Sequence, residues 1–476
     1  MLFVPFNKKS VKPIIMELKH IKHIFREYDI RGLIDLEITD DFVYSLGHAL
    51  SQLFLEAGQN RILLGYDTRK NSAHYHNILA KTFAENGLHV ISLGMIPSPC
   101  LYFAVHYLQI KAGVIVTASH NPSQYNGFKI WLNECTINKQ EILSLYEKIT
   151  KLSLTKNKQN IQKGFIGYHD IQTSYTQKVL ENIPPLNCKV VIDGANGSAG
   201  NLCVNIFQKA GAKVIPLFCD EQENFSNHEP DPTNPKNLKA LCQKIMQEQA
   251  DYGIALDGDG DRVVLVDNNA RILKSDELMS IFIHHYCNTR NNPLFLLDVK
   301  CSQELIKEII EKNGKYVLCP TGHAILKRNM IQTQAIFGGE FSGHFFHADN
   351  WYKTDDGILT AIRAIAILQN NNDSLTYYPN WLQNKRFFSS DEIKIPCPEN
   401  LKQEKLQTII QLIENKYSSQ AQIIKIDGIR VLLENAWFLV RISNTSPAFT
   451  LRFEANEKEV FERLQNEIMQ LVQENI

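Results

Sequence analysis

Arg61–Tyr66 reads RILLGY and Gly113–Thr117 reads GVIVT, two short apolar runs of the kind that form buried β-strands. Between them lie an amphipathic run at Ser72–Asn86, typical of a helix, and another strand-like run at His89–Leu93. This alternation of strands and helices predicts parallel α/β units, in which helices cover the faces of a sheet.

The alternation recurs twice further along the chain. A second stretch begins with Lys189–Asp193 (KVVID) and includes Tyr252–Asp257 (YGIALD). A third begins with Leu294–Val299 (LFLLDV) and includes Ala335–Gly339 (AIFGG). We therefore predict three similar α/β domains. In open α/β sheets, ligands bind beyond the carboxyl ends of the strands, so the polar residues that directly follow these strands are the candidates for chemistry.

The C-terminal part of the chain has a different pattern. A helix is expected near Glu404–Tyr417, and a final amphipathic helix near Glu457–Ile476. Four closely spaced strands are expected between them, at Gln422–Ile426, Ile429–Glu434, Trp437–Ile442 and Phe449–Glu454. This order predicts an α+β domain with an antiparallel sheet.

The chain has 476 residues, too many for one hydrophobic core. We predict four domains, with boundaries at 1–164, 165–270, 271–382 and 383–476. The polar segments Lys156–Gln162 and Asn370–Asp373 are the candidate linkers.

The composition excludes several broad classes of protein. With 44% hydrophobic and 21% charged residues, it is typical of a soluble globular protein. A formal net charge of −1 leaves no chain-wide basic field, so we expect no nucleic-acid partner. No apolar run is long enough to cross a bilayer, so we expect no membrane association. The ten cysteines form no CxxC pair, which favours a reducing cytoplasm over a disulfide framework or a zinc ribbon.

The first chemical motif is Thr117–Pro122, which reads TASHNP. Ser119 follows a buried strand among small residues, so a substrate can reach it. His120 and Lys129 add cationic donors that can stabilise phosphoryl oxygens. The alternative is a polar turn, because Ser, His, Asn and Pro are common turn formers. A Ser-His-Asp hydrolase is disfavoured, since no GxSxG surrounds Ser119.

The second motif is Asp257–Arg262, which reads DGDGDR. Alternate carboxylates on a glycine-rich turn can converge on one hard cation, and three of them would repel one another without it. An EF-hand is excluded, because Arg262 stands at its glycine position and Asn268 at its final glutamate position. Few carboxylates leave room for a phosphate oxygen as a further ligand, which suits magnesium. An acidic turn without metal is the alternative.

Two further loops carry polar groups. Gly338–His344 (GGEFSGH) combines a carboxylate, a hydroxyl and an imidazole that can bind sugar hydroxyls, although a structural loop fits this string equally well. Arg441–Pro447 (RISNTSP) places an arginine before hydroxyls that can complete a phosphate cradle, although a simple strand-to-turn transition also explains it. Neither GxxxxGK[ST] nor GxGxxG occurs, so ATP and NAD are unsupported.

Taken together, these strings resemble the α-D-phosphohexomutase superfamily, and within it the bacterial phosphomannomutase/phosphoglucomutase branch. The resemblance covers nearly the whole chain, and the motifs occur in the family's order. Further matching strings are Phe25–Gly32 (FREYDIRG), His228–Pro232 (HEPDP), Asp298–Cys301 (DVKC), Thr321–His323 (TGH) and Asp355–Gly357 (DDG).

The resemblance implies a fold and a set of site residues. The fold would be three similar α/β domains with mixed sheets plus a C-terminal α+β domain, arranged around a central cleft. Ser119 would carry the phosphoryl group and, with Asp257, Asp259 and Asp261, hold Mg²⁺. The reacting centre would be lined by Arg31, His120, Lys129 and Arg262. The substrate would be bound by Tyr28, Lys300, His323, Glu340, Ser342, His344, Arg441, Ser443, Asn444 and Thr445.

The resemblance also implies an activity. Hexose 1-phosphate and hexose 6-phosphate, of mannose and/or glucose, would interconvert through a phosphoserine and a hexose 1,6-bisphosphate, which would also be the activator. A monomer is expected. For the general base, the candidates are Lys129, with a pKa lowered by a nearby arginine, His120 and His323.

Two alternative activities stay open. A phosphoglucosamine mutase usually has Ser-Gly-Thr in its phosphate loop, whereas Ser443-Asn444-Thr445 stands here. Phe341 and Pro320 occupy positions where the mannose/glucose branch usually has methionine and lysine. The second alternative is a metal-dependent sugar phosphatase, in which the phosphoserine is hydrolysed.

Overall fold

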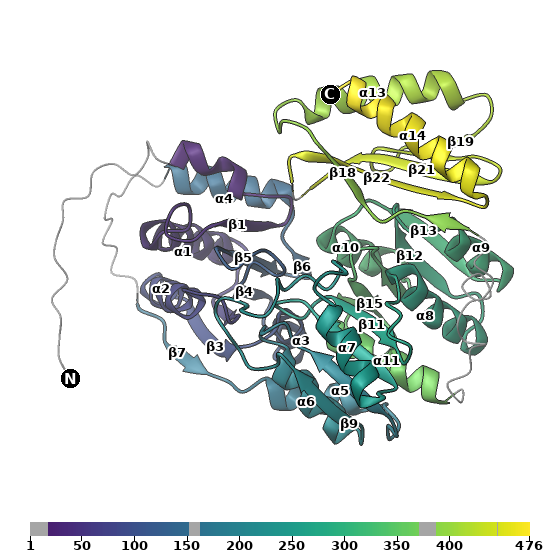
Figure 1. Ribbon diagram of the computed structural model, residues 1–476. Coiled ribbons are helices and arrows are strands. Elements are labelled where there is room, and N and C mark those ends of the chain that lie inside the picture. Colours follow the sequence, from purple (N-terminus) through teal and green to yellow (C-terminus); the bar gives the residue numbers. More distant parts are fainter. Residues whose placement is uncertain (1–17, 152–161, 371–386, 445) are drawn as a thin grey trace.

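The computed structural model describes residues 18–151, 162–370, 387–444 and 446–476. Of the two predicted linkers, only Gln162 and Asn370 lie within these residues. The rest of both linkers lies outside them, as does Thr445. Within the described residues the chain forms four sheets, three of them mixed and one antiparallel (Figure 1). This arrangement confirms the predicted fold class, three α/β domains followed by an α+β domain.

The first sheet has the order β1-β5-β4-β2-β3-β7, and β6 pairs with β5. Strands β4, β2, β3 and β7 run parallel, while β5 is antiparallel to both β4 and β1. The strands are β1 (Asp29–Leu33), β2 (Arg61–Tyr66), β3 (His89–Met95), β4 (Ala112–Val116), β5 (Tyr125–Leu132), β6 (Cys135–Thr136) and β7 (Ile166–Tyr168). The helices are α1 (Asp40–Glu56), α2 (Ser72–Glu85), α3 (Ser98–Tyr107) and α4 (Lys139–Lys151).

The side chains of β2 explain the layers of this domain. Successive residues of a strand point to opposite faces. Ile62 and Leu64 accordingly join the core formed with α1, α2 and α4, whereas Leu63 joins a second core on the side of α3. The continuous apolar run is therefore a central strand buried on both faces.

The second and third sheets repeat the plan with fewer strands. The second has the order β11-β10-β8-β9 and the third β13-β12-β14-β15-β16. The second domain contains α5 (Gln172–Leu180), β8 (Lys189–Asp193), α6 (Gly200–Lys209), β9 (Lys213–Leu217), α7 (Lys239–Glu248), β10 (Tyr252–Leu256) and β11 (Val263–Asp267). The third contains α8 (Ser275–Thr289), β12 (Leu294–Asp298), α9 (Gln303–Glu311), β13 (Lys315–Cys319), α10 (His323–Thr333), β14 (Phe337–Gly339), β15 (Phe345–His347), β16 (Thr354–Asp355) and α11 (Gly357–Asn370).

The fourth sheet is antiparallel and packs against two helices, at the top of Figure 1. Its order is β17-β22-β21-β20-β19, and β18 pairs with β22. Its elements are β17 (Phe388–Ser389), β18 (Ile393–Pro396), α13 (Lys402–Tyr417), β19 (Gln422–Ile424), β20 (Ile429–Leu432), β21 (Ala436–Ile442), β22 (Ala448–Ala455) and α14 (Lys458–Glu474).

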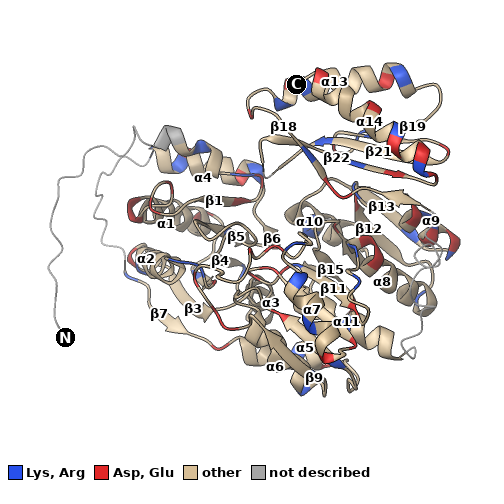
Figure 2. Cartoon of the chain, viewed as in Figure 1, with Lys and Arg blue, Asp and Glu red and all other residues tan. Residues whose placement is uncertain are grey.

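The hydrophobic cores divide the molecule unevenly. One continuous core joins α3 of the first domain to the second and third sheets, and α11 of the third domain packs on β10 and β11 of the second. The fourth domain has a core of its own. Lys/Arg and Asp/Glu are nearly equal in number and are interspersed over the ribbon in Figure 2. None of the described helices combines the length and hydropathy needed to span a membrane.

Candidate active site

Ser119 stands directly after β4, in a tight loop with a left-handed backbone (φ 52°). Its N–H donates to Thr117 Oγ1 at 2.9 Å, and its Oγ donates to Asp257 Oδ2 at 2.9 Å. The imidazole Nδ1 of His120 is 3.3 Å from the same Oγ. The side chain of Ser119 is thus aimed from the first domain at the carboxylates of the second.

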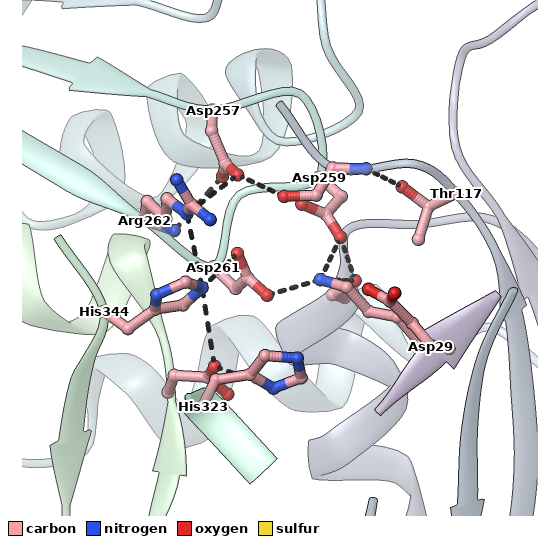
Figure 3. A network of polar contacts seen from close by, with 12 residues as sticks. Asp29, Thr117, Asp257, Asp259, Asp261, Arg262, His323 and His344 are labelled. Atoms are coloured by element: carbon pink, nitrogen blue, oxygen red, sulfur yellow. Dashed lines mark hydrogen bonds and ion pairs between the residues drawn. The ribbon is translucent and has the colours of Figure 1, made fainter. Parts of the chain in front are cut away.

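Asp257, Asp259 and Asp261 lie on the turn between β10 and β11, with carboxylate oxygens within 4.8 Å of one another (Figure 3). The turn is pressed against the serine loop, since a Cβ on Gly258 would lie 2.6 Å from Ser119 O. Among the described residues, Asp259 Oδ1 is buried without a hydrogen-bond partner. Burial, and then Asp259 and Asp261, raise the pKa of Asp257 well above its usual value. The clustered carboxylate oxygens fit a hard divalent cation.

Lys129, on β5, already supplies one positive charge to this cluster. Its Nζ is 2.5 Å from Asp259 Oδ2 and 2.5 Å from Asp261 Oδ2. Burial alone would lower the pKa of Lys129, but the two carboxylates outweigh it and hold that pKa well above its usual value. The prediction of a lowered pKa is therefore wrong, because the nearby Arg31 counts for less than the two carboxylates.

Three further cationic or imidazole groups surround the serine. Arg31 pairs with Asp29 at 2.7 Å and donates to Ala118 O at 3.1 Å, which ties β1 to the serine loop. The backbone N–H of Arg262 donates to Asp257 Oδ1 at 3.1 Å, and its guanidinium Nε lies 3.9 Å from Asp257 Oδ2. Burial, followed by the charges of Arg262 and Arg31, lowers the pKa of His120 well below its usual value. His120 is consequently neutral at pH 7.

The loop after β14 forms a closed polar network. Ser342 Oγ donates to Glu340 Oε2 at 2.7 Å, and His344 Nδ1 is 3.1 Å from the same oxygen. The other nitrogen, Nε2, is 3.3 Å from Asp261 Oδ1. Although burial opposes it, Asp261 and Glu340 raise the pKa of His344 to about 9. Burial alone would raise the pKa of Glu340, but His344 and then Lys300 outweigh burial and lower this pKa to about 2.

The fourth domain contributes Arg441, near the end of β21, and the loop that follows this strand. Arg441 Nε donates to Asp427 Oδ2 at 2.8 Å, and its Nη2 is buried without a hydrogen-bond partner among the described residues. Ser443 Oγ lies 2.8 Å from Ser446 Oγ, and Asn444 Nδ2 donates to Thr321 O at 3.1 Å. The loop thus meets the third domain while one guanidinium nitrogen stays available for a ligand.

The remaining predicted contacts come from the first and third domains. Lys300 Nζ donates to Glu392 Oε1 at 2.6 Å. The rings of Tyr28 and His323 meet edge to face, with centroids 4.5 Å apart. Burial, followed by the charge of Lys327, lowers the pKa of His323 well below its usual value.

A cavity of about 630 Å³ brings most of these residues together. The predicted residues in its wall are Tyr28, Arg31, His120, Arg262, Lys300, His323, Glu340, Ser342, His344, Arg441, Ser443 and Asn444. Ser119, Lys129, Asp257, Asp259 and Asp261 are buried beside the wall rather than part of it. The position of Thr445 lies outside the described residues.

Sequence reasoning missed several residues of this wall. Asp391, Glu392 and Lys394 line it from the fourth domain, and no string in the sequence marks them. Asp231 lies in the HEPDP string, so a signal was present but no role was assigned. These side chains reach the cavity only through the packing of one domain on another.

The four domains also match family models in order. The models for phosphoglucomutase/phosphomannomutase alpha/beta/alpha domains I, II and III match residues 22–156, 169–270 and 274–381, and the model for the C-terminal domain matches residues 392–471.

Individual relatives align over almost their full length. The chain is 37% identical to a phosphomannomutase/phosphoglucomutase of Pseudomonas aeruginosa over 443 residues, which are 93% of each chain. It is 33% identical to a phosphoglucomutase of Neisseria meningitidis, covering 95% of this chain and 97% of that one. A crystal structure of a phosphoglucomutase/phosphomannomutase family protein from Burkholderia thailandensis superposes with a TM-score of 0.85, at 30% identity and over 95% of this chain and 97% of the other. The chain belongs to the phosphoglucomutase/phosphomannomutase family of the α-D-phosphohexomutase superfamily.

Proposed function

We propose that this chain is a phosphohexomutase that interconverts hexose 1-phosphate and hexose 6-phosphate, with mannose and/or glucose as the sugar. One observation carries the proposal: the hydroxyl of Ser119 lies 2.9 Å from a three-carboxylate cluster, beside a cavity whose wall includes Arg441 of the fourth domain. A nucleophile from the first domain and a separate anion site from the fourth domain suit a substrate with two phosphorylation positions.

The reaction is two phosphoryl transfers in opposite senses. In the first, the Oγ–P bond of phosphorylated Ser119 breaks and a bond from phosphorus to a sugar hydroxyl oxygen forms. The proton of that hydroxyl leaves through a base and returns to Ser119 Oγ, so a hexose 1,6-bisphosphate and a free serine result. After the bisphosphate turns around, the reverse transfer of its other phosphate restores the phosphoserine. A trace of hexose 1,6-bisphosphate is accordingly the activator.

Charge neutralisation is the main contribution of the protein, because phosphoryl transfer spreads negative charge over the phosphoryl oxygens. Arg31, Arg262 and Lys129 supply fixed positive charge around Ser119. Asp257, Asp259 and Asp261 would hold Mg²⁺, which supplies further neutralisation of phosphate oxygens when bound. We assign Mg²⁺ because its oxygen preference matches the donor set.

We propose a neutral imidazole as the proton acceptor. Although burial opposes it, Asp259 and Asp261 hold the pKa of Lys129 well above its usual value when no metal is bound, which disfavours Lys129 as a base. His120 and His323 have lowered pKa values and both line the cavity. His120, 3.3 Å from Ser119 Oγ, is placed to pass the proton to or from the serine.

The sugar and the distal phosphate are bound by the third and fourth domains. Glu340, Ser342 and His344 offer acceptors and donors to sugar hydroxyls, while Arg441, Ser443, Asn444 and Thr445 grip the phosphate that does not react. Lys300 and Tyr28 complete the substrate contacts. We propose a monomer, since the residues assigned here to the nucleophile, the metal, the sugar and the distal phosphate all belong to one chain. All ten cysteines are free, which supports a reducing compartment such as the cytoplasm.

The test is turnover of mannose 1-phosphate, glucose 1-phosphate and glucosamine 1-phosphate with magnesium and a trace of hexose 1,6-bisphosphate. We expect the first two to give their 6-phosphates and the third to be poor. Conversion of glucosamine 1-phosphate alone would replace the sugar assignment, and release of free phosphate alone would make the chain a phosphatase.

A further inference from the structure

Arg69 lies on the connection between β2 and α2, beneath the loop that carries Ser119. It is 2% exposed, and its terminal guanidinium nitrogens donate to backbone carbonyls of the chain, so it offers no free group to a substrate. No string in the sequence marks it as chemical. Its contacts nevertheless concentrate on the nucleophile loop.

The guanidinium of Arg69 donates to four backbone carbonyls of a seven-residue segment, Ser119–Tyr125. Nη2 donates to Ser119 O at 2.5 Å and to Asn121 O at 2.6 Å. Nη1 donates to Pro122 O at 2.9 Å and to Tyr125 O at 3.1 Å. The carbonyls of an irregular loop have no neighbouring strand to donate hydrogen bonds to them, and the Arg69 side chain supplies these bonds instead.

The guanidinium is itself held from two domains. Asp67 Oδ2 is 3.2 Å from Arg69 Nε, and Asp67 Oδ1 accepts from the hydroxyl of Ser72 at 2.7 Å. The ring of Phe225, in the second domain, lies 4.7 Å from the guanidinium carbon. Arg69 therefore touches both domains whose groups must meet at the reacting centre.

We infer that Arg69 is a positioning residue that fixes Ser119 against the carboxylate cluster. Ser119 holds a left-handed backbone, which a residue with a side chain adopts only when its surroundings impose it. Its carbonyl oxygen is enclosed by Arg69 on one side and by Gly258 on the other, where a Cβ would come within 2.6 Å. The direction of the Ser119 side chain follows from this clamp. The inference rests on the proposed phosphoserine mechanism.

Lysine cannot reproduce the clamp. The planar fork of arginine presents its N–H groups in fixed, divergent directions, whereas an ammonium group is a compact point donor. Arg69→Lys keeps the positive charge and most of the volume, so it separates the geometry of the fork from its charge.

The experiment compares the wild-type chain, Arg69→Lys and Asp67→Asn, each with Mg²⁺. Turnover of glucose 1-phosphate and phosphorylation of Ser119 by glucose 1,6-bisphosphate, followed by intact mass, are the readouts. Because a misplacement of about 1 Å reduces rates about 100-fold, we expect kcat and the rate of Ser119 phosphorylation to fall at least tenfold in Arg69→Lys. KM should stay within about twofold, since the guanidinium of Arg69 is bound to the loop carbonyls and to Asp67 rather than to the substrate. Asp67→Asn, which loosens Arg69, should show a smaller loss of the same kind.

Arg363→Lys is the matched control. Arg363 also donates to a backbone carbonyl, Asp349 O at 2.9 Å, but it does not line the cavity. The kcat of Arg363→Lys should therefore equal that of the wild type. Circular dichroism and thermal melting give the folded fraction of each variant, and rates are expressed per folded molecule. If Arg69→Lys does not fold, the rates of Asp67→Asn are the test of the inference. Wild-type kcat and phosphorylation rate in the folded variant overturn the inference, as does a rise in KM alone. If the wild-type chain itself neither turns over nor gains phosphate at Ser119, the proposed function fails instead.

Discussion

At the scale of single residues, Ser119 is distinguished by three properties together: burial, a left-handed backbone and a hydrogen bond to Asp257. Ser119→Ala removes the only atom that can carry the phosphoryl group in the proposed mechanism, while the backbone contacts of the loop remain. We expect nearly all turnover of glucose 1-phosphate to disappear and the melting temperature to change little. Ser51→Ala, which removes a buried hydroxyl in α1, is the control and should keep its activity. Wild-type turnover in Ser119→Ala would exclude the nucleophile assignment.

Lys129 gives a second prediction at this scale. Without metal it is the main counter-charge for Asp259 and Asp261, and removing one partner of a buried ion pair costs about 3–5 kcal/mol. Lys129→Met should therefore lower the free energy of unfolding in EDTA by an amount of that order. Mg²⁺ should then stabilise the variant more than the wild type, because nothing competes for the carboxylates.

Urea unfolding with EDTA and with Mg²⁺ measures the effect. Lys300→Met is the control, since Lys300 is also buried but pairs with Glu392 at 2.6 Å, and neither Glu392 nor Lys300's other partner Asp298 is among the carboxylates that could hold a metal. Its destabilisation should be similar in both buffers. An equal response of Lys129→Met and Lys300→Met to Mg²⁺ would contradict the metal site at Asp257, Asp259 and Asp261.

At the scale of elements, the start of α11 is tied to α5 through one carboxyl. Asp356 Oδ1 accepts from Leu359 N, and the hydroxyl of Tyr175 donates to both oxygens, at 2.9 and 3.0 Å. Burial raises the pKa of Asp356 to about 7, from about 3.9 in an unfolded chain. The folded state therefore keeps a proton that the unfolded state loses. This contribution to stability is full below pH ~4 and is lost as the pH rises through about 7.

Asp356→Asn should remove this pH dependence. The wild-type chain should lose stability relative to the variant between pH ~4 and ~7, by at most about 1.4 kcal/mol per pH unit. Urea titrations of both proteins at several pH values measure the difference. Parallel stability curves would show that Asp356 is ionised in the fold.

The elements also show what the sequence can and cannot predict. The bounds of β2 and β8 match the expected strands, because apolar runs buried on both faces leave little ambiguity. The edge strands β1 and β7 were not expected as strands: β1 reads DIRGL, and its charged Asp29 and Arg31 serve the site rather than a strand pattern. β7 has three residues, none of them buried, so it lacks a hydrophobic signal.

The candidate site also has a part that the sequence predicts and a part that it does not. The loops of Ser119, Asp257, Glu340 and Arg441 were found because each groups polar residues after a strand. Partners such as Lys129 with Asp259, or Lys300 with Glu392, could not be predicted, because the two members lie about a hundred residues apart and only tertiary packing joins them. The roles assigned to these residues stay predictions until variants are measured.

At the scale of the whole molecule, the cavity depends on a fourth domain with a separate core. This domain contributes Arg441 to the cavity wall, alongside Lys394, and hydrogen bonds to charged groups are worth about 1.5–3 kcal/mol. Arg441→Gln should raise KM for glucose 1-phosphate about 10- to 100-fold, with a smaller effect on kcat, as steady-state kinetics would measure. Arg463→Gln, at an exposed position on α14, should behave as wild type. An unchanged KM in Arg441→Gln would remove this loop from the substrate site.

The packing of α11 across β10 and β11 has a consequence for how the chain is made. α11 packs on β10 and β11, and its Ile358 and Ile362 share one hydrophobic core with Ile254 and Leu265 of the second sheet, although about a hundred residues separate them along the chain. A ribosome therefore releases the second sheet well before its cover exists, and that apolar face waits for the third domain to emerge. Growing chains of this protein should bind chaperones most strongly in this window, and messages truncated before residue 357 should yield products that proteases remove.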